Sequence, residues 1–239
     1  MNNYKKFILS IIVLFLSASL FSQTKKDTLH ILFVGNSYTY FQEMPKMLSA
    51  FSKNTQTKIT TQMSAPGGAR LREHWLGQRG MKTKEIIKNG AFDIVVLQGQ
   101  SMAALKRPDT LKKYSKLFSD YIKKHNAEPY FYMTWARKKT PERQKDITRV
   151  YTEIATANKA TLVPVGNAWA MAKKLRPNIS LYTPDGSHPN QLGAYLTASV
   201  FAASLLHELP SKIDHSTFLI KKKDGEFCME IAKQFSSKK

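Results

Sequence analysis

A serine, a histidine and an aspartate in this sequence have the side chains that nucleophilic catalysis requires. Ser37 follows Gly35 and Asn36 near the start of the chain, and Asp185 lies three residues before His188 near its end. A serine hydroxyl attacks a carbonyl well only when a neighbouring base removes its proton. A neutral imidazole can act as that base near neutral pH, and a carboxylate can orient the ring and stabilise the imidazolium. The pattern therefore predicts a Ser-His-Asp triad for acyl transfer.

Donors for the oxyanion that such an attack creates are also present in the sequence. The candidates are the backbone N–H groups of Ser37, Gly67 and Gly68, and a side-chain amide of Gln98 or Gln100. Glycines suit this role because, without side chains, their N–H groups can approach a substrate oxygen closely. We favour Gly68 over Gly67, because the proline before Gly67 makes that glycine suitable for the turn itself.

Three further residues are candidates for contact with substrate. Asn36 precedes the serine, and it either contacts substrate or braces the turn. His74 follows the glycines and either lines the pocket or is an ordinary surface histidine. Trp135 follows the fourth predicted strand, where it either stacks on a sugar ring or packs in the core.

Five β-prone runs explain how residues so distant in sequence can meet. They occupy residues 29–34, 58–63, 93–97, 129–134 and 161–165, and helical patterns occupy residues 43–52, 110–125, 141–158 and 190–206. Strands that alternate with helices indicate an α/β domain with a parallel sheet covered on both faces. The run 93–97, with one polar residue before an apolar stretch, is the clearest central strand. Pro164 indicates an edge or terminal position for the last run. Polar groups after the strands would gather at the carboxyl edge of the sheet.

These blocks, in this order, resemble the SGNH (GDSL-like) hydrolase superfamily. The first block is residues 33–37, with Asn36 where aspartate is commoner; the second contains the paired glycines, and the last is complete as Asp185 and His188. The resemblance covers residues 28–208. It implies a flavodoxin-like three-layer α/β/α sandwich around a parallel sheet of about five strands, and a serine esterase. The GxSxG motif of the α/β-hydrolases is absent from the sequence.

The third block departs from the family pattern. The family usually has Gly-x-Asn there, and this chain has Gln98-Gly99-Gln100-Ser101. The run is similar to the Gln-Gly-Glu variant of the carbohydrate-esterase and sialate-acetylesterase branch, or to uncharacterised secreted bacterial members. That likeness implies that Gln98 completes the oxyanion hole, with Gln100 in reserve, and that the substrate is a small O-acyl ester, with O-acetyl on carbohydrate expected. A lipase, a thioesterase, an acyltransferase and a non-catalytic glycan-binding protein remain alternatives.

The first 22 residues are typical of a secretory signal peptide. Lys5 and Lys6 precede an apolar run that is shorter than the about 20 residues of a membrane span, and small residues follow it. We therefore expect a periplasmic or secreted protein with no membrane span after cleavage. The mature chain would be one domain, residues 23–239, whose last part, 209–239, extends beyond the core as an extra helix or a docking element.

Composition limits the remaining function classes. The chain has 37 Lys and Arg against 17 Asp and Glu, a net charge of +20. The lysines are spread along the sequence rather than interleaved with stacking aromatic residues, which indicates a solvated basic surface instead of nucleic-acid binding. The single cysteine, Cys228, excludes a disulfide framework, and no cluster has metal-ligand spacing. The sequence thus predicts neither a metal nor another cofactor, and it leaves the oligomeric state open.

Overall fold

The computed structural model describes residues 28–206, 209–210 and 213–236. The predicted signal peptide, residues 1–22, lies outside these ranges, and its cleavage stays a prediction. Within the described ranges, none of the helices combines the length and the hydropathy needed to span a bilayer.

A sheet of five parallel strands forms the centre of the molecule, in the order β2-β1-β3-β4-β5. Its strands are β1 (Thr28–Val34), β2 (Lys58–Ser64), β3 (Ile94–Leu97), β4 (Glu128–Tyr132) and β5 (Thr161–Val163). Each neighbouring pair is parallel. The predicted parallel α/β sheet is confirmed, as are the central position of β3 and the edge position of β5.

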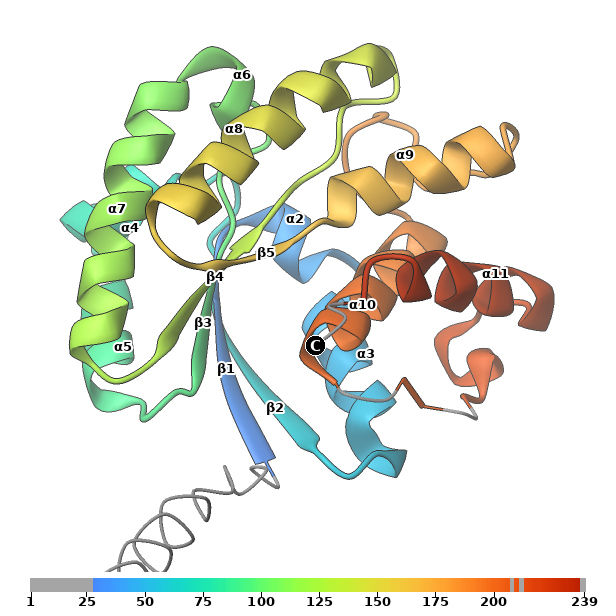
Figure 1. Ribbon diagram of the computed structural model, residues 1–239, viewed down its shortest axis with the longest axis horizontal. Coiled ribbons are helices and arrows are strands. Elements are labelled where there is room, and N and C mark those ends of the chain that lie inside the picture. Colours follow the sequence, from blue (N-terminus) through green and yellow to red (C-terminus); the bar gives the residue numbers. More distant parts are fainter. Residues whose placement is uncertain (1–27, 207–208, 211–212, 237–239) are drawn as a thin grey trace, which may run out of the picture.

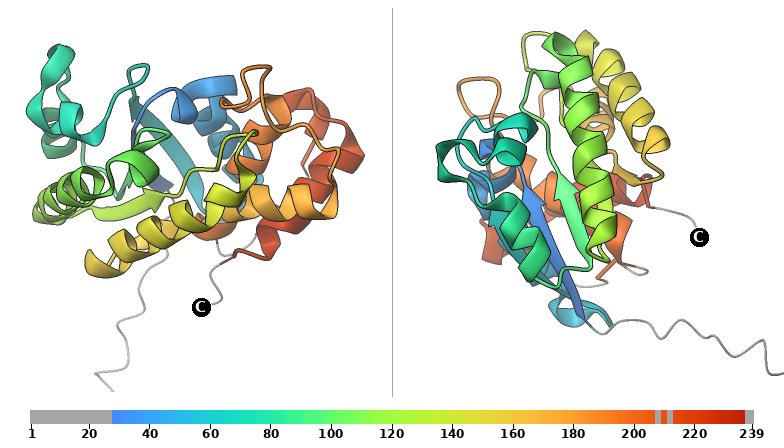
Figure 2. Two further views of the ribbon diagram at one scale, coloured as in Figure 1. Left: turned by 90° about the horizontal axis from the view of Figure 1, so that it is seen from above. Right: turned by 90° about the vertical axis from the view of Figure 1, so that its left-hand side faces the viewer.

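Ten α-helices in the described ranges surround the sheet. They are α2 (Ser37–Tyr40), α3 (Met44–Phe51), α4 (Leu71–Leu76), α5 (Thr83–Asn89), α6 (Ala103–Lys106), α7 (Pro108–Lys124), α8 (Gln144–Ala157), α9 (Val165–Leu175), α10 (Gln191–Leu205) and α11 (Lys222–Lys233). The views along and across the sheet show one layer of helices on each face (Figures 1 and 2). This is the expected three-layer α/β/α sandwich.

Alternate residues of β1 divide the apolar interior into two cores. Ile31 and Phe33 pack into the core under α3, α9, α10 and α11, whereas Leu32 and Val34 pack into the core under α7 and α8. All four side chains are fully buried. Side chains of a strand alternate between its two faces, so a strand with helices on both sides reads as a continuous apolar run. That is why residues 29–34 are recognisable in the sequence.

The C-terminal extension contains a helix. In α11, Cys228, Ile231 and Ala232 are buried and belong to the same core as α10. The C-terminal extension is therefore part of the helical layer that covers this face of the sheet.

The strand β5 is shorter than the predicted run 161–165. Pro164 cannot donate a backbone hydrogen bond to a neighbouring strand, and it directly precedes the first residue of α9.

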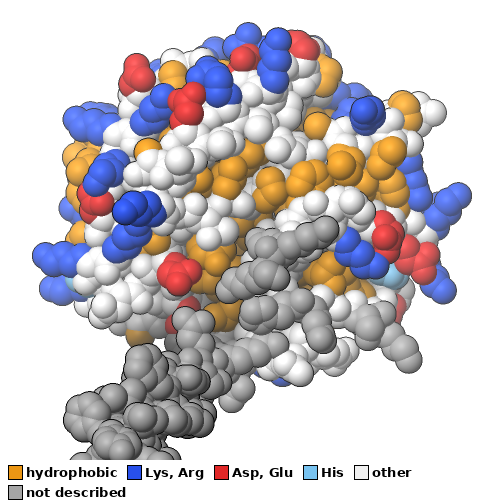
Figure 3. All heavy atoms as spheres, in the orientation of Figure 1, with side chains coloured by type: hydrophobic (Ala, Val, Ile, Leu, Met, Phe, Trp, Pro, Cys, Tyr) orange, Lys and Arg blue, Asp and Glu red, His pale blue; other side chains and the backbone are white. Residues whose placement is uncertain are grey.

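Lysine and arginine side chains are distributed around the visible surface rather than gathered in one stripe (Figure 3). Several form exposed ion pairs within one helix, such as Lys116 with Asp120 and Arg149 with Glu153. Pairs of this kind, open to solvent, contribute little to stability.

Candidate active site

Ser37, His188 and Asp185 meet at the carboxyl edge of the sheet. The Ser37 Oγ lies 2.8 Å from His188 Nε2. On the other side of the ring, His188 Nδ1 lies 2.5 Å from Asp185 Oδ2. Ser37 is the first residue of α2, directly after β1, and His188 lies in the loop before α10. The fold thus brings the three predicted triad residues into one hydrogen-bonded chain.

Asn36 holds the turn that carries Ser37. Its side-chain Oδ1 accepts a hydrogen bond from the Tyr38 N–H at 3.1 Å, and its Nδ2 donates to the Ala69 carbonyl at 3.0 Å. The side chain is buried, with 2% of the residue exposed. Both ends of its amide are occupied inside the protein, so Asn36 braces the turn. Its alternative role as a substrate contact does not fit this position.

Gln98 lies beneath the same turn and does not face the substrate side. Its Oε1 accepts from the Asn36 N–H at 2.9 Å and from the Thr39 hydroxyl at 3.1 Å, while its Nε2 donates to the Gly99 carbonyl. Only 1% of the residue is exposed. The expectation that Gln98 supplies an oxyanion donor is therefore corrected. The two donors that converge on its oxygen fix the amide orientation, and its NH₂ is turned away from Ser37.

Gly35 has to be a glycine because Gln98 and Thr39 occupy the space of a side chain. A Cβ at Gly35 would lie 2.5 Å from Gln98 Oε1 and 2.6 Å from Thr39 Oγ1. We expect Gly35→Ala to lower the free energy of unfolding by about 1–3 kcal/mol, because overpacking forces these hydrogen-bonded groups apart. Urea unfolding of wild type and variant measures this change. An unchanged midpoint with an unchanged slope would show that the turn can relax at no cost.

Asp185 is an ionised acceptor whose hydrogen bonds fix the imidazole of His188. Besides His188 Nδ1, the carboxylate accepts from Thr183 Oγ1 at 2.7 Å and from the N–H groups of Ser187 and His188 at 2.8 and 3.0 Å. Partial desolvation raises the pKa of Asp185, but these hydrogen bonds, that from His188 first, outweigh it and hold the pKa well below its usual range. A carboxylate at Nδ1 leaves Nε2 free to accept the Ser37 proton.

This depressed pKa predicts how stability depends on pH. The ionised carboxylate stabilises the folded state fully above the unfolded-state pKa of about 3.9, and the contribution disappears as the pH falls through the folded-state pKa. When His188 is replaced by Gln so that no imidazole titrates, the bonds from Thr183 and from the N–H groups of residues 187 and 188 still hold the carboxylate. In that background we expect Asp185→Asn to lower the free energy of unfolding by a constant amount above about pH 5. The difference should shrink below about pH 4. Denaturant unfolding at several pH values measures it, and a difference that grew on acidification would contradict the assignment.

Trp135 supports the histidine loop from inside the protein. It is 1% exposed, and its ring stacks on Tyr38 at 4.7 Å and on Trp169 at 3.9 Å. Its Nε1 donates to the Ser187 carbonyl at 2.9 Å. A buried ring sandwiched between two others has no face left for a sugar. The expectation that Trp135 stacks on substrate is therefore corrected to a positioning role.

Two aromatic residues of the site, Tyr38 and Phe41, were not predicted from the sequence. The Tyr38 hydroxyl lies 2.6 Å from Ser187 Oγ, which ties α2 to the histidine loop. The ring of Phe41 stacks on the imidazole of His188 with 4.3 Å between centroids. The only signal in the sequence is the aromatic cluster that follows Ser37, residues 38–41, and nothing in it indicates the partner.

His74 is an internal residue and not part of the pocket wall. It is 1% exposed, with Nδ1 lying 2.8 Å from Thr83 Oγ1 and Nε2 lying 2.8 Å from the Gly35 carbonyl. Burial lowers its pKa, which favours the neutral ring. The expectation that His74 contacts substrate is corrected: both nitrogens are used to join α4, α5 and the Ser37 turn.

The paired glycines form an open turn beside the serine. The Ala69 N–H donates to the Pro66 carbonyl at 3.1 Å, and Gly68 has a φ of +68°. A turn with positive φ at its third residue favours glycine there. No heavy atom lies within 4 Å of a Cβ built on Gly68, whereas a Cβ on Gly67 would lie 3.3 Å from the Tyr40 hydroxyl. Both glycines are exposed, and the space beside Gly68 is the more open.

Gln100 differs from Gln98 in being half-buried. Its Nε2 donates to Ser101 Oγ at 3.1 Å, and its Oε1 accepts from the Met102 N–H at 3.0 Å. Reorienting this amide towards an oxyanion would break at least one of these contacts. The backbone N–H groups of Ser37, Gly67 and Gly68 therefore remain as the candidate donors. Ser37 opens α2, so its N–H has no helical carbonyl to bind.

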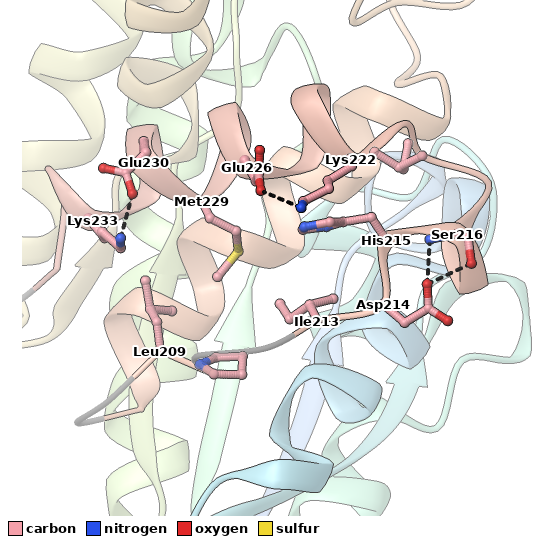
Figure 4. Close-up of a pocket in the computed structure, with 12 residues that line it drawn as sticks. Leu209, Ile213, Asp214, His215, Ser216, Lys222, Glu226, Met229, Glu230 and Lys233 are labelled. Atoms are coloured by element: carbon pink, nitrogen blue, oxygen red, sulfur yellow. Dashed lines mark hydrogen bonds and ion pairs between the residues drawn. The ribbon is translucent and has the colours of Figure 1, made fainter.

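A cavity of about 670 Å³ between α11 and the segment before it contains another aspartate, histidine and serine (Figure 4). These are Asp214, His215 and Ser216, but they do not form a relay. Asp214 accepts from the N–H and hydroxyl of Ser216, and His215 Nδ1 lies 2.7 Å from the Tyr195 hydroxyl. These contacts differ from the relay of Ser37, His188 and Asp185, although the residue types are the same.

Known proteins share the fold of this chain at low sequence identity. No protein-family model matches the chain, and neither does any curated protein. A protein from Slackia heliotrinireducens, provisionally named an SGNH hydrolase, is 28% identical and has a TM-score of 0.61 over 73% of this chain and 97% of its own. This chain has the SGNH hydrolase fold. A DUF4886 family protein from Bacteroides uniformis (16% identity) reaches a TM-score of 0.72 over 87% of this chain and 94% of its own.

The solved structure of an acetyl xylan esterase, AlAXEase, is also similar to this chain. It is 16% identical, with a TM-score of 0.57 over 71% of this chain and 96% of its own. At this identity the likeness concerns the fold. In this fold Ser37 closely follows β1, and the loops after β2 and β3 contact its neighbour Asn36. The loop before α10 brings His188 to Ser37.

Proposed function

We propose that this protein is a serine esterase that uses Ser37, His188 and Asp185 to hydrolyse small acyl esters. The observation that carries the proposal is the continuous chain of hydrogen bonds, 2.8 Å from Ser37 Oγ to His188 Nε2 and 2.5 Å from His188 Nδ1 to Asp185 Oδ2. A positioned nucleophile, a base and a group that orients the base are the parts that acyl transfer requires.

The first half of the reaction forms an acyl-enzyme. His188 removes the Ser37 proton as Oγ attacks the ester carbonyl, and the negative charge moves to the carbonyl oxygen. The N–H groups of Ser37 and Gly68 stabilise that oxyanion. His188 then protonates the departing alcohol. In the second half, His188 removes a proton from water, the hydroxide attacks the acyl group, and the acid leaves as Ser37 recovers its proton.

We propose O-acetyl groups on carbohydrate as the substrate. The name of the structurally similar acetyl xylan esterase, which is an esterase for acetylated xylan, supports this class. The signal-like residues 1–22 support action in the periplasm or outside the cell, where such polymers are found.

A panel of p-nitrophenyl esters and acetylated saccharides tests this function. We expect turnover of p-nitrophenyl acetate, with the specificity constant falling as the acyl chain lengthens, and release of acetate from acetylated saccharides. A specificity constant that is higher for p-nitrophenyl butyrate than for p-nitrophenyl acetate would instead favour a lipase. Purified, folded protein that hydrolyses none of these esters and reacts with no acyl donor would overturn the proposal.

A further inference from the structure

A small cationic cavity lies beside the proposed active site. Its volume is about 240 Å³. Its walls carry Arg70, which directly precedes α4, Arg72 in the first turn of α4, Lys106 at the end of α6, and Arg107 between α6 and α7. Its other lining residues are polar and uncharged or apolar, and no acidic residue is among them. We propose that this cavity binds an anionic group, the carboxylate of an acidic sugar, on the alcohol part of the ester.

The four cations keep their charge available to a ligand. None of them forms an ion pair with an acidic residue of the described ranges. The nearest acids in the sequence are Glu73, whose carboxylate accepts from a backbone N–H, and Asp109, which does not line the cavity. Four like charges around one hollow concentrate positive potential there and attract anions.

Two links join the cavity to the Ser37 turn. Arg70 directly follows Ala69, whose carbonyl accepts from Asn36 Nδ2 at 3.0 Å. Gln100, which also lines the cavity, lies two residues after Gln98. The Oε1 of Gln98 accepts from the N–H of Asn36, the residue before the nucleophile, at 2.9 Å. An ester held at Ser37 therefore extends naturally towards this cavity.

The volume of the cavity and the side chains that line it indicate which part of the substrate it would bind. The volume is below the about 300–1,000 Å³ of pockets for drug-sized ligands, so it suits one small charged group with its adjoining ring. Leu71 and Leu111 line the cavity with apolar surface, and the guanidinium groups of Arg72 and Arg107 match the planar oxygens of a carboxylate. Because the acyl group at Ser37 is a small one, the anion belongs to the alcohol part. This inference rests on the proposed esterase function.

Matched substrates separate the inference from the proposed function. We would measure kcat/KM for acetylated methyl glucuronide, its neutral methyl ester, an acetylated sugar sulfate and p-nitrophenyl acetate. We expect the wild type to prefer the glucuronide over the neutral ester by about tenfold at low salt, with the preference falling as ionic strength rises. A sulfate preferred over the carboxylate would overturn the choice of a uronate, while equal rates for anionic and neutral esters would overturn the anion site.

Paired variants locate the effect. Arg72→Gln/Arg107→Gln should remove most of the preference for the acid, whereas Lys88→Gln/Lys124→Gln removes the same charge at the opposite edge of the sheet and should retain it. Preference that persists in the first variant would overturn the cavity as its source. If no ester is hydrolysed, the proposed function has failed, and the anion site is tested by binding alone. Calorimetry then measures the binding of methyl glucuronide to the wild type and to the Arg72→Gln/Arg107→Gln variant. Equal binding to both proteins, or no binding to the wild type, would overturn the anion site.

Discussion

Replacing Ser37 with alanine is expected to abolish ester hydrolysis while leaving the fold intact. The variant lacks the nucleophile, and removal of the nucleophile from a catalytic triad typically lowers kcat by roughly 10⁴- to 10⁶-fold. The Ser37 hydroxyl interacts with His188, and the turn itself is held by Asn36 and Gln98. Initial rates with p-nitrophenyl acetate measure the loss, and circular dichroism and the unfolding midpoint check the fold.

The control for this variant is Ser216→Ala. Ser216 lies next to an aspartate and a histidine in sequence, but its hydroxyl donates only within a local turn. Turnover should be unchanged in this variant. If Ser37→Ala retained more than about a tenth of the wild-type rate, hydrolysis would have another origin and the nucleophile would be wrongly assigned.

Replacing His188 with glutamine is expected to lower kcat by roughly 10⁴-fold or more. Glutamine has a similar length but cannot take a proton from Ser37 near neutral pH. Since the triad acts as one unit, Ser37→Ala/His188→Gln should be no more than a few times slower than the worse single variant. Rates of both single variants and the double variant, measured with the same ester, give this coupling directly.

His125→Gln supplies the matched control. His125 lies at the C-terminal end of α7, where its ring contacts Tyr121. Its replacement should leave the rate unchanged. If the loss of kcat in the double variant equalled the product of the two single-variant losses, Ser37 and His188 would act independently. The hydrogen bond between them would then have no role in the reaction.

Much of the fold could be predicted because its signals are local. An apolar run such as 93–97 needs burial on both faces, which only a central strand of a covered parallel sheet provides. The helix α9 was not predicted, because its first residue, Val165, belongs to the β-prone run 161–165. The one-turn helix α2 is too short to show a helical pattern.

The triad was predictable because its three residue types have a recognisable order and spacing. The orientation of the surrounding side chains was not. Gln98 follows β3, where sequence position alone suggests a place on the rim, but contacts with Asn36 and Thr39 turn it inward. Trp135 is likewise drawn into the interior by Trp169, a residue 34 positions later. Such choices depend on partners distant in the sequence, and no local pattern encodes them.

Labelling with a fluorophosphonate is the most direct test of the central claim that Ser37 is an activated nucleophile. The reagent forms a covalent bond with a serine whose proton is removed by a neighbouring base. Peptide mass spectrometry of the folded wild type should find the label on Ser37, with His188→Gln labelled far more slowly and Ser37→Ala not labelled there. Absence of label on Ser37 in active protein, or equal labelling rates in wild type and His188→Gln, would contradict the account.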